Sequence, residues 1–146
     1  MTKSLDEYYE ELAAMPLTAT DKEVATAMID CYIAARHKNH RGRIHLRLAQ
    51  DQDLKSDLKM KLPRGFTHWR KSVWILTVDD TNESKAKTLA IDALLQGYAI
   101  CVSYHQDSSA SGFGSIAGWR KREAETRKLW PSARPNSPER IARKGE

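Results

Sequence analysis

Basic side chains interleaved with aromatic rings are the feature of this sequence best suited to binding chemistry. Residues 36–71 contain 11 Lys and Arg but only three acidic residues. Arg and Lys neutralise phosphates, and an exposed aromatic ring stacks on an unpaired base. We therefore expect nucleic-acid contacts here, with a solvated strand face over a core Trp69 as the alternative. The expected contacts are Arg36, Lys38, His40, Arg41, Arg43, Arg47, Lys61, Arg64, Phe66, Trp69, Arg70 and Lys71.

A second basic segment follows a stretch rich in glycine and serine. Residues 108–118 contain three glycines, and Arg120, Lys121 and Arg122 follow after Trp119. A glycine-rich loop that opens a helix presents backbone N–H groups to an anion. We expect these three residues to add phosphate contacts, with a mobile loop as the alternative. The glycine spacing resembles a dinucleotide-binding loop only loosely, so we expect no cofactor.

The charges of this 146-residue chain are segregated along the sequence, although its net charge is only +5. The net charge is −5 over residues 1–35, +8 over 36–71, −3 over 72–110 and +5 over 111–146. Such segregation raises the local electrostatic potential well above the average for the chain. If the two basic segments meet on one side of the fold, they form a surface for a polyanion.

These charges predict a non-enzymatic nucleic-acid-binding protein, with DNA or RNA as its partner. The alternative is a protein-interaction module, an inhibitor or adaptor that docks on an acidic partner protein. A predicted helix face favours that alternative, because Trp119 and Trp130 lie there beside Arg120 and Arg127, and Trp and Arg are typical interface anchors. For Trp119 we prefer packing in the core, with the arginine stems turned outward.

Acidic residues at the ends of two predicted strands suggest a second alternative, a metal-dependent nuclease. Asp79, Asp80 and Glu83 follow one strand, and His105 and Asp107 follow the next. Carboxylates and an imidazole can hold a divalent metal for phosphodiester cleavage. No ligand spacing here is specific, so helix capping by Asp80 and a surface position for His105 are preferred. We predict no catalytic residue and no metal ligand.

Three histidines lie among the basic residues of the first segment. They are His37, His40 and His45. Neighbouring positive charge opposes metal binding, so a zinc site is not expected. Protonation below about pH 6.5 instead adds charge to the basic surface.

Two capping-box patterns predict helices in the first quarter of the chain. Ser4 with Glu7 begins a helix over residues 4–14, and Thr20 with Glu23 begins one over residues 20–38. The second helix is apolar over most of its circumference, so we expect it to be buried against a sheet.

Alternating residues predict a strand over residues 43–49, with a basic outer face formed by Arg43, His45 and Arg47. More uniformly apolar strands at 72–79 and 98–105 flank a helix at 82–96, which Asp80 and Thr81 cap and Gly97 ends. This order predicts a βαβ unit with parallel strands and a right-handed crossover. Within residues 50–71, Leu54 and Leu58 fit one or two helical turns, whereas Leu58, Met60 and Leu62 equally fit a short strand.

The predicted architecture is an α+β fold in a single domain over residues 1–130. A small mixed sheet of three or four strands is packed by two largely apolar helices, and a basic helix follows from about residue 115 to 130. Residues 131–146 contain three prolines and no apolar periodicity, which predicts a disordered basic tail.

Composition excludes several classes of protein. No apolar run approaches 18 residues, so no transmembrane helix and no membrane partner are expected. The N-terminus turns acidic at once and has no apolar signal core. Cys31 and Cys101 each lie in an apolar stretch, which indicates reduced core thiols in a cytoplasmic protein. Oligomeric state is not predicted.

Overall fold

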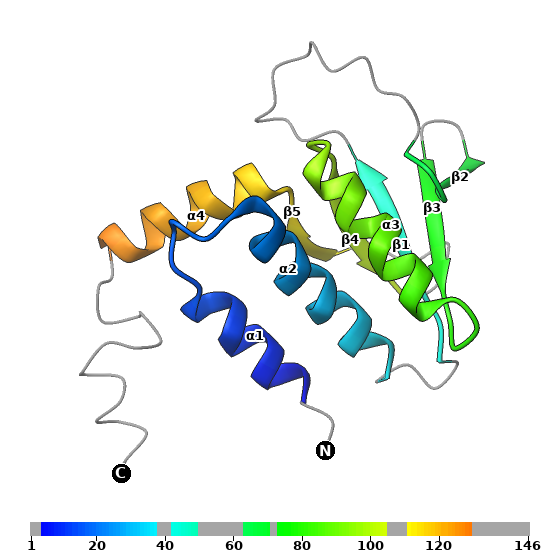
Figure 1. The fold of residues 1–146 in the computed structure, drawn as a ribbon, viewed down its shortest axis with the longest axis horizontal. Helices are drawn as coiled ribbons and strands as arrows, with labels where there is room; N and C mark the ends of the chain where they lie inside the picture. The colour runs from blue at the N-terminus through cyan, green and yellow to red at the C-terminus, as the bar shows by residue number, and fades with distance from the viewer. Residues whose placement is uncertain (1–3, 38–41, 50–62, 71–72, 105–110, 130–146) are drawn as a thin grey trace.

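A computed structural model describes residues 4–37, 42–49, 63–70, 73–104 and 111–129. Its helices are α1 (Leu5–Ala14), α2 (Asp21–Arg36), α3 (Glu83–Leu95) and α4 (Ile116–Leu129). Its strands are β1 (Ile44–Ala49), β2 (Thr67–Arg70), β3 (Val73–Val78), β4 (Ala99–Ser103) and β5 (Ser111–Gly114). The strands form one sheet in the order β2-β3-β1-β4-β5, shown with the helices in Figure 1.

Every neighbouring pair of described strands is antiparallel. The central strand is β1, with Ile44 opposite Val78 of β3 and His45 opposite Ser103 of β4. The α+β class is confirmed, but the expected mixed sheet of three or four strands is wrong. The strands β3 and β4, which α3 connects, run in the same direction, yet β1 lies between them and removes the expected parallel pair. Periodicity identifies a strand but does not identify its neighbours.

Both predicted N-caps form, and the full capping box forms at the second helix. The Ser4 hydroxyl accepts the N–H of Glu7 at the start of α1. At the start of α2, Thr20 Oγ1 accepts the N–H of Glu23, and the Glu23 carboxylate accepts the N–H of Thr20, each at 3.2 Å. These reciprocal bonds satisfy donors that the first turn of a helix leaves without partners.

The core lies between one face of the sheet and the helices. The helix α2 buries nine of its 16 residues, which confirms the expectation of a buried helix. Ile44, Leu46 and Leu48 of β1 are buried in the same core. The Tyr32 hydroxyl donates to the Ile100 carbonyl at 2.6 Å and joins α2 to β4. Because side chains alternate along a strand, His45 and Arg47 must lie on the opposite face of the sheet.

The turn before α3 differs from the expected cap. Asn82, rather than Asp80 or Thr81, occupies the N-cap position, without a side-chain cap bond. Its amide donates to the Thr77 carbonyl and accepts the N–H of Asp79. The Asp79 carboxylate accepts the hydroxyl and the N–H of Thr81, and these bonds lower the pKa of Asp79. The helix ends at Gly97 as predicted, with a left-handed φ of 101°.

Two strands were not expected from the sequence. The aromatic and basic stretch contains β2, and the predicted glycine-serine loop contains β5. The ambiguous residues 50–62 and the predicted tail at 131–146 lie outside the described residues. Among the described helices, none is long and apolar enough to span a membrane.

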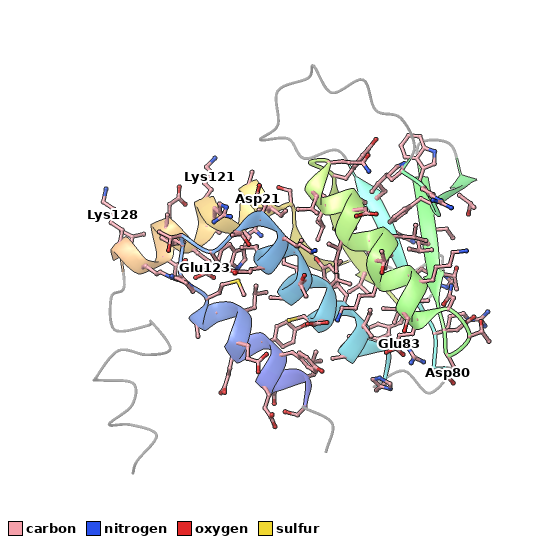
Figure 2. All side chains as sticks on the ribbon, in the orientation of Figure 1. Asp21, Asp80, Glu83, Lys121, Glu123 and Lys128 are labelled. Carbon is pink, nitrogen blue, oxygen red and sulfur yellow. The ribbon has the colours of Figure 1, made fainter. Side chains whose placement is uncertain are left out.

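Arg36 links the end of α2 to the turn that precedes α3. Its side chain is buried, with 2% of the residue exposed. Nη1 donates to Asp80 Oδ1 at 2.7 Å and to the Gly42 carbonyl at 2.8 Å, and Nη2 donates to the Glu83 carboxylate. Figure 2 shows Asp80 and Glu83 at this end of the molecule. Burial lowers the pKa of Arg36, but the bonds to Asp80 and Glu83 outweigh it and raise that pKa.

Replacement of Arg36 is expected to destabilise the fold. Arg36→Met should lower the free energy of unfolding by about 1.5 kcal/mol, because it removes the charged donor to Asp80, Glu83 and the Gly42 carbonyl. Asp80→Ala should cost only about 0.5 kcal/mol, since the Asp80 side chain is 88% exposed. Urea denaturation measures both, with Arg64→Met at an exposed position as the control. Equal unfolding midpoints for Arg36→Met and Arg64→Met would contradict this role.

Candidate nucleic-acid interface

One face of the sheet is turned away from α2 and α3. It carries the residues of the central strands that alternate with the core residues. We call it the outer face. In β1, Arg47 lies opposite Ile75 of β3 on one side and Cys101 of β4 on the other. His45 lies in the same way between Thr77 and Ser103. The outer face therefore consists of His45, Arg47, Ile75, Thr77, Cys101 and Ser103.

The basic face expected for β1 is only partly accessible. His45 is 7% exposed, and its Nδ1 lies 3.0 Å from Thr77 Oγ1. Arg47 is half-buried, and only Arg43, just before the strand, is exposed. His45 lies on the outer face as expected, but the expected exposure is wrong, because a central strand has neighbours on both sides and the imidazole packs between them. His45 therefore adds no exposed imidazole to the basic surface.

Charges from the two basic segments act on the same place. Burial raises the pKa of the Cys101 thiol, while Arg47 and Arg122 each act to lower it. Arg122 belongs to α4, and its Nη1 lies 3.9 Å from where a Cβ on Gly114 of β5 would be. Arg47 and Arg122 therefore lie near each other on β1 and α4, beside the β4–β5 side of the sheet.

Several of the predicted contact residues are exposed. They are Arg43, Arg64, Lys121 and Arg122. Lys121 extends outward from α4 in Figure 2, as does Lys128 near the end of the same helix. The helix α4 carries five basic and two acidic residues, whereas α1 carries four carboxylates and no basic residue. The segregation of charge along the sequence therefore persists in the fold, where α1 is acidic and α4 is basic.

Two arginines of α4 bind the protein itself. Arg120 donates to the carbonyls of Leu17 and Ala19, each at 2.7 Å, and to the carboxylate of Asp21. Arg127 donates to two carbonyls at the end of α1, those of Ala13 at 2.9 Å and Met15 at 2.7 Å. A guanidinium has five donors in a fixed plane, which suits carbonyls that a helix end leaves without partners. These bonds join α4 to α1 and to the turn after it.

Three of the predicted nucleic-acid contacts are therefore corrected. Arg36 is buried on two carboxylates, and Arg120 is held by two carbonyls and Asp21. Phe66 is 3% exposed and belongs to the hydrophobic core, so its ring is not available for stacking. The sequence gives the number of basic and aromatic side chains, but it does not show which of them are buried or bound within the fold. Trp119, for which core packing was the preferred interpretation, is buried in the core.

Other predicted contacts are described partly or not at all. Trp69 and Arg70 lie on β2, the strand at one edge of the sheet. Five predicted residues lie outside the described part of the chain: Lys38, His40, Arg41, Lys61 and Lys71.

At the N-terminus of α4, which was expected to present N–H groups to a phosphate, a side chain of the protein binds one of these groups. Ser115, just before α4, is buried, and its hydroxyl accepts the N–H of Gly118 at 2.9 Å. That donor is consequently satisfied within the chain. The preceding residues Ser111–Gly114 pair with β4 as a strand, rather than forming a loop open to an anion.

The acidic residues of the nuclease alternative also have internal partners. Asp80 and Glu83 bind Arg36, and Asp79 binds Thr81. In the described part of the chain, no group of three or more His, Cys, Asp or Glu is arranged to hold a metal ion. His105 and Asp107, the other members of that candidate, lie outside the described residues.

Sequence analysis missed two features of the surface. Cys101 is a half-buried thiol on the outer face, whereas it was expected in the core. The first two helices also form a groove of about 520 Å³, lined in part by Glu11, Glu23 and Asp30. The excess of acidic residues in positions 1–35 was a signal for the charge of this groove. It does not show that α1 and α2 pack side by side to form it.

The reactivity of Cys101 is expected to report the position of Arg122. Arg122→Glu should raise the pKa of the Cys101 thiol further and slow its alkylation near pH 8 by about three- to tenfold, because the thiolate is the nucleophile. Mass spectrometry after iodoacetamide treatment measures the rate. Buried Cys31, whose pKa burial raises to about 12, is an unreactive internal reference.

Lys121→Glu is the matched control for this measurement, because it makes the same change of charge on the adjacent residue, which extends outward (Figure 2). It should alter the rate much less than Arg122→Glu does. If the two variants slow alkylation equally, Arg122 does not lie beside Cys101 as described.

Comparison with known proteins gives no relative from which a function can be transferred. No protein-family model, curated protein or solved structure that was compared with this chain matches it. The assignment of a function therefore depends on the charges and contacts of the described residues.

Proposed function

We propose that this protein binds nucleic acid without catalysing a reaction, in the cytoplasm, through a surface formed by β1 and α4. The members of this surface are Arg43, Arg47, Lys121 and Arg122, and we call it the β1–α4 surface. One observation carries the proposal: Arg47 lies opposite Cys101 of β4, and Arg122 lies beside Gly114 of β5, which pairs with the neighbouring Ile100. Two positive charges from separate basic segments near one point favour a phosphate backbone as the ligand.

The geometry supports phosphate binding better than base recognition. Arg43, Lys121 and Arg122 are exposed at the protein surface, whereas Arg47 is half-buried. Long cationic side chains of this kind reach phosphate oxygens and fix the register of a complex, but they carry no sequence information. We therefore propose binding that tolerates sequence, with Trp69 on β2 as a further candidate for stacking on bases.

The distribution of charge supports one direction of approach. The acidic residues of α1 repel a polyanion, whereas the β1–α4 surface attracts it. Both described cysteines are free, which supports a reducing compartment.

The experiment is a binding titration of random single- and double-stranded oligonucleotides over a series of salt concentrations. The double variant Arg47→Ala/Arg122→Ala should weaken binding by about tenfold at moderate salt. It should also reduce the slope of log affinity against log salt by about 2, because two phosphate contacts are lost. Fluorescence anisotropy of a labelled oligonucleotide measures both quantities.

The double variant Lys22→Ala/Lys85→Ala is the matched control. It removes the same charge from exposed positions on α2 and α3. It should leave the salt slope nearly unchanged. Equal losses in the two double variants would mean that net charge alone drives binding, and no binding by the unchanged protein at low salt would leave the protein-interaction alternative.

A further inference from the structure

A groove between α1 and α2 has the chemistry of a docking site for a cationic, partly apolar segment. It has a volume of about 520 Å³. Residues at helical spacing line it from both sides. On the α1 side they are Tyr8, Glu11 and Met15. On the α2 side they are Thr20, Lys22, Glu23, Thr26, Ala27 and Asp30. Tyr8, Met15 and Ala27 give it apolar surface, and three carboxylates against one lysine give it a net negative charge.

Two of the three carboxylates of this groove bind other groups of the protein. Asp30 pairs with Lys87 of α3 at 2.6 Å, and Glu23 accepts the backbone N–H of Thr20. The buried Cys31 beside the groove still senses a negative field. Burial is the largest cause of its raised pKa, and Asp30 and Glu11 raise that pKa further. A cationic occupant would therefore be stabilised there.

The end of α4 lies at one end of the groove. Arg127 holds the last turn of α4 on the carbonyls of Ala13 and Met15, and Met15 also lines the groove. Leu129, two residues later, is 65% exposed. Figure 1 shows this last turn of α4 beside the connection between α1 and α2. The last described turn of α4 therefore lies next to the groove.

The sequence of residues 130–146 complements the groove in charge and in length. This segment has four basic and two acidic residues, and its stretch Arg140–Lys144 reads Arg-Ile-Ala-Arg-Lys. The chain from Leu129 to Ile141 can span up to about 40 Å when extended. The groove along α1, from Tyr8 to Met15, is only about 10 Å long at the helical rise. The segment can therefore reach every part of the groove.

We propose that residues 140–144 dock in the α1–α2 groove of their own chain. Ile141 covers the apolar surface of Met15 and Ala27, and the flanking Arg140, Arg143 and Lys144 pair with the carboxylates of the groove. Attachment through α4 gives the segment an effective concentration on the order of millimolar, which favours its own groove over that of another copy. This proposal does not depend on nucleic-acid binding.

The test uses the full chain with a fluorophore attached at its C-terminus, and measures fluorescence anisotropy at low salt. In the unchanged protein the anisotropy should be high, because the segment tumbles with the folded body. Glu11→Lys should lower it toward the value of the free labelled peptide 130–146. Glu10→Lys, the same change at an adjacent exposed residue that does not line the groove, should not lower it.

A second pair of variants tests the contact from the other side. Ile141→Asp should lower the anisotropy, whereas Ser137→Asp, which adds the same charge to the same segment, should lower it much less. An excess of unlabelled peptide 130–146 should compete and lower the anisotropy of the unchanged protein.

Three results would overturn the proposal. They are low anisotropy in the unchanged protein, equal effects of Glu10→Lys and Glu11→Lys, and anisotropy that falls on about hundredfold dilution, which would indicate docking on a second copy. Circular dichroism of each variant verifies that the helices are intact.

Discussion

The packing of α2 and α3 on one face of β1 is the constraint on which the rest of the structure depends. Burial of Ile44, Leu46 and Leu48 fixes the register of the central strand, because a shift by one residue would place charged side chains in the core. The same alternation places Arg47 on the outer face beside Cys101. The packing of the core therefore decides which side chains of β1 lie on the outer face. One of them, Arg47, belongs to the β1–α4 surface.

The arginines of this protein divide into internal links and surface charges. Arg36, Arg120 and Arg127 donate to carboxylates and to carbonyls near helix ends, and hold together elements that are distant in the sequence. Such bonds combine charge with several fixed donors, which is why arginine rather than lysine suits them. Exposure at the protein surface separates other arginines, including Arg43 and Arg122, from these internal links. A basic composition alone therefore overestimates the size of a binding face.

Local patterns were sufficient to predict the helices and the three longest strands, including the capping box of Thr20 and Glu23, because those signals lie within a few residues. The position of β1 between β3 and β4 was not predictable, since it depends on contacts between distant segments. Edge strands such as β2 were missed because they are short and have weak periodicity. For the candidate site, exposure of Arg43 and Lys121 followed from sequence, whereas burial of Arg36 and Phe66 depended on tertiary neighbours.

The two arginine links from α4 also affect the order in which the molecule is completed. Arg127 and the Ala13 carbonyl are 114 residues apart in the chain, and Arg120 and Leu17 are 103 apart. During synthesis, α1 leaves the ribosome long before the side chains that hold its last carbonyls exist. The end of α1 can therefore reach its native contacts only after α4, the last described helix, has been synthesised.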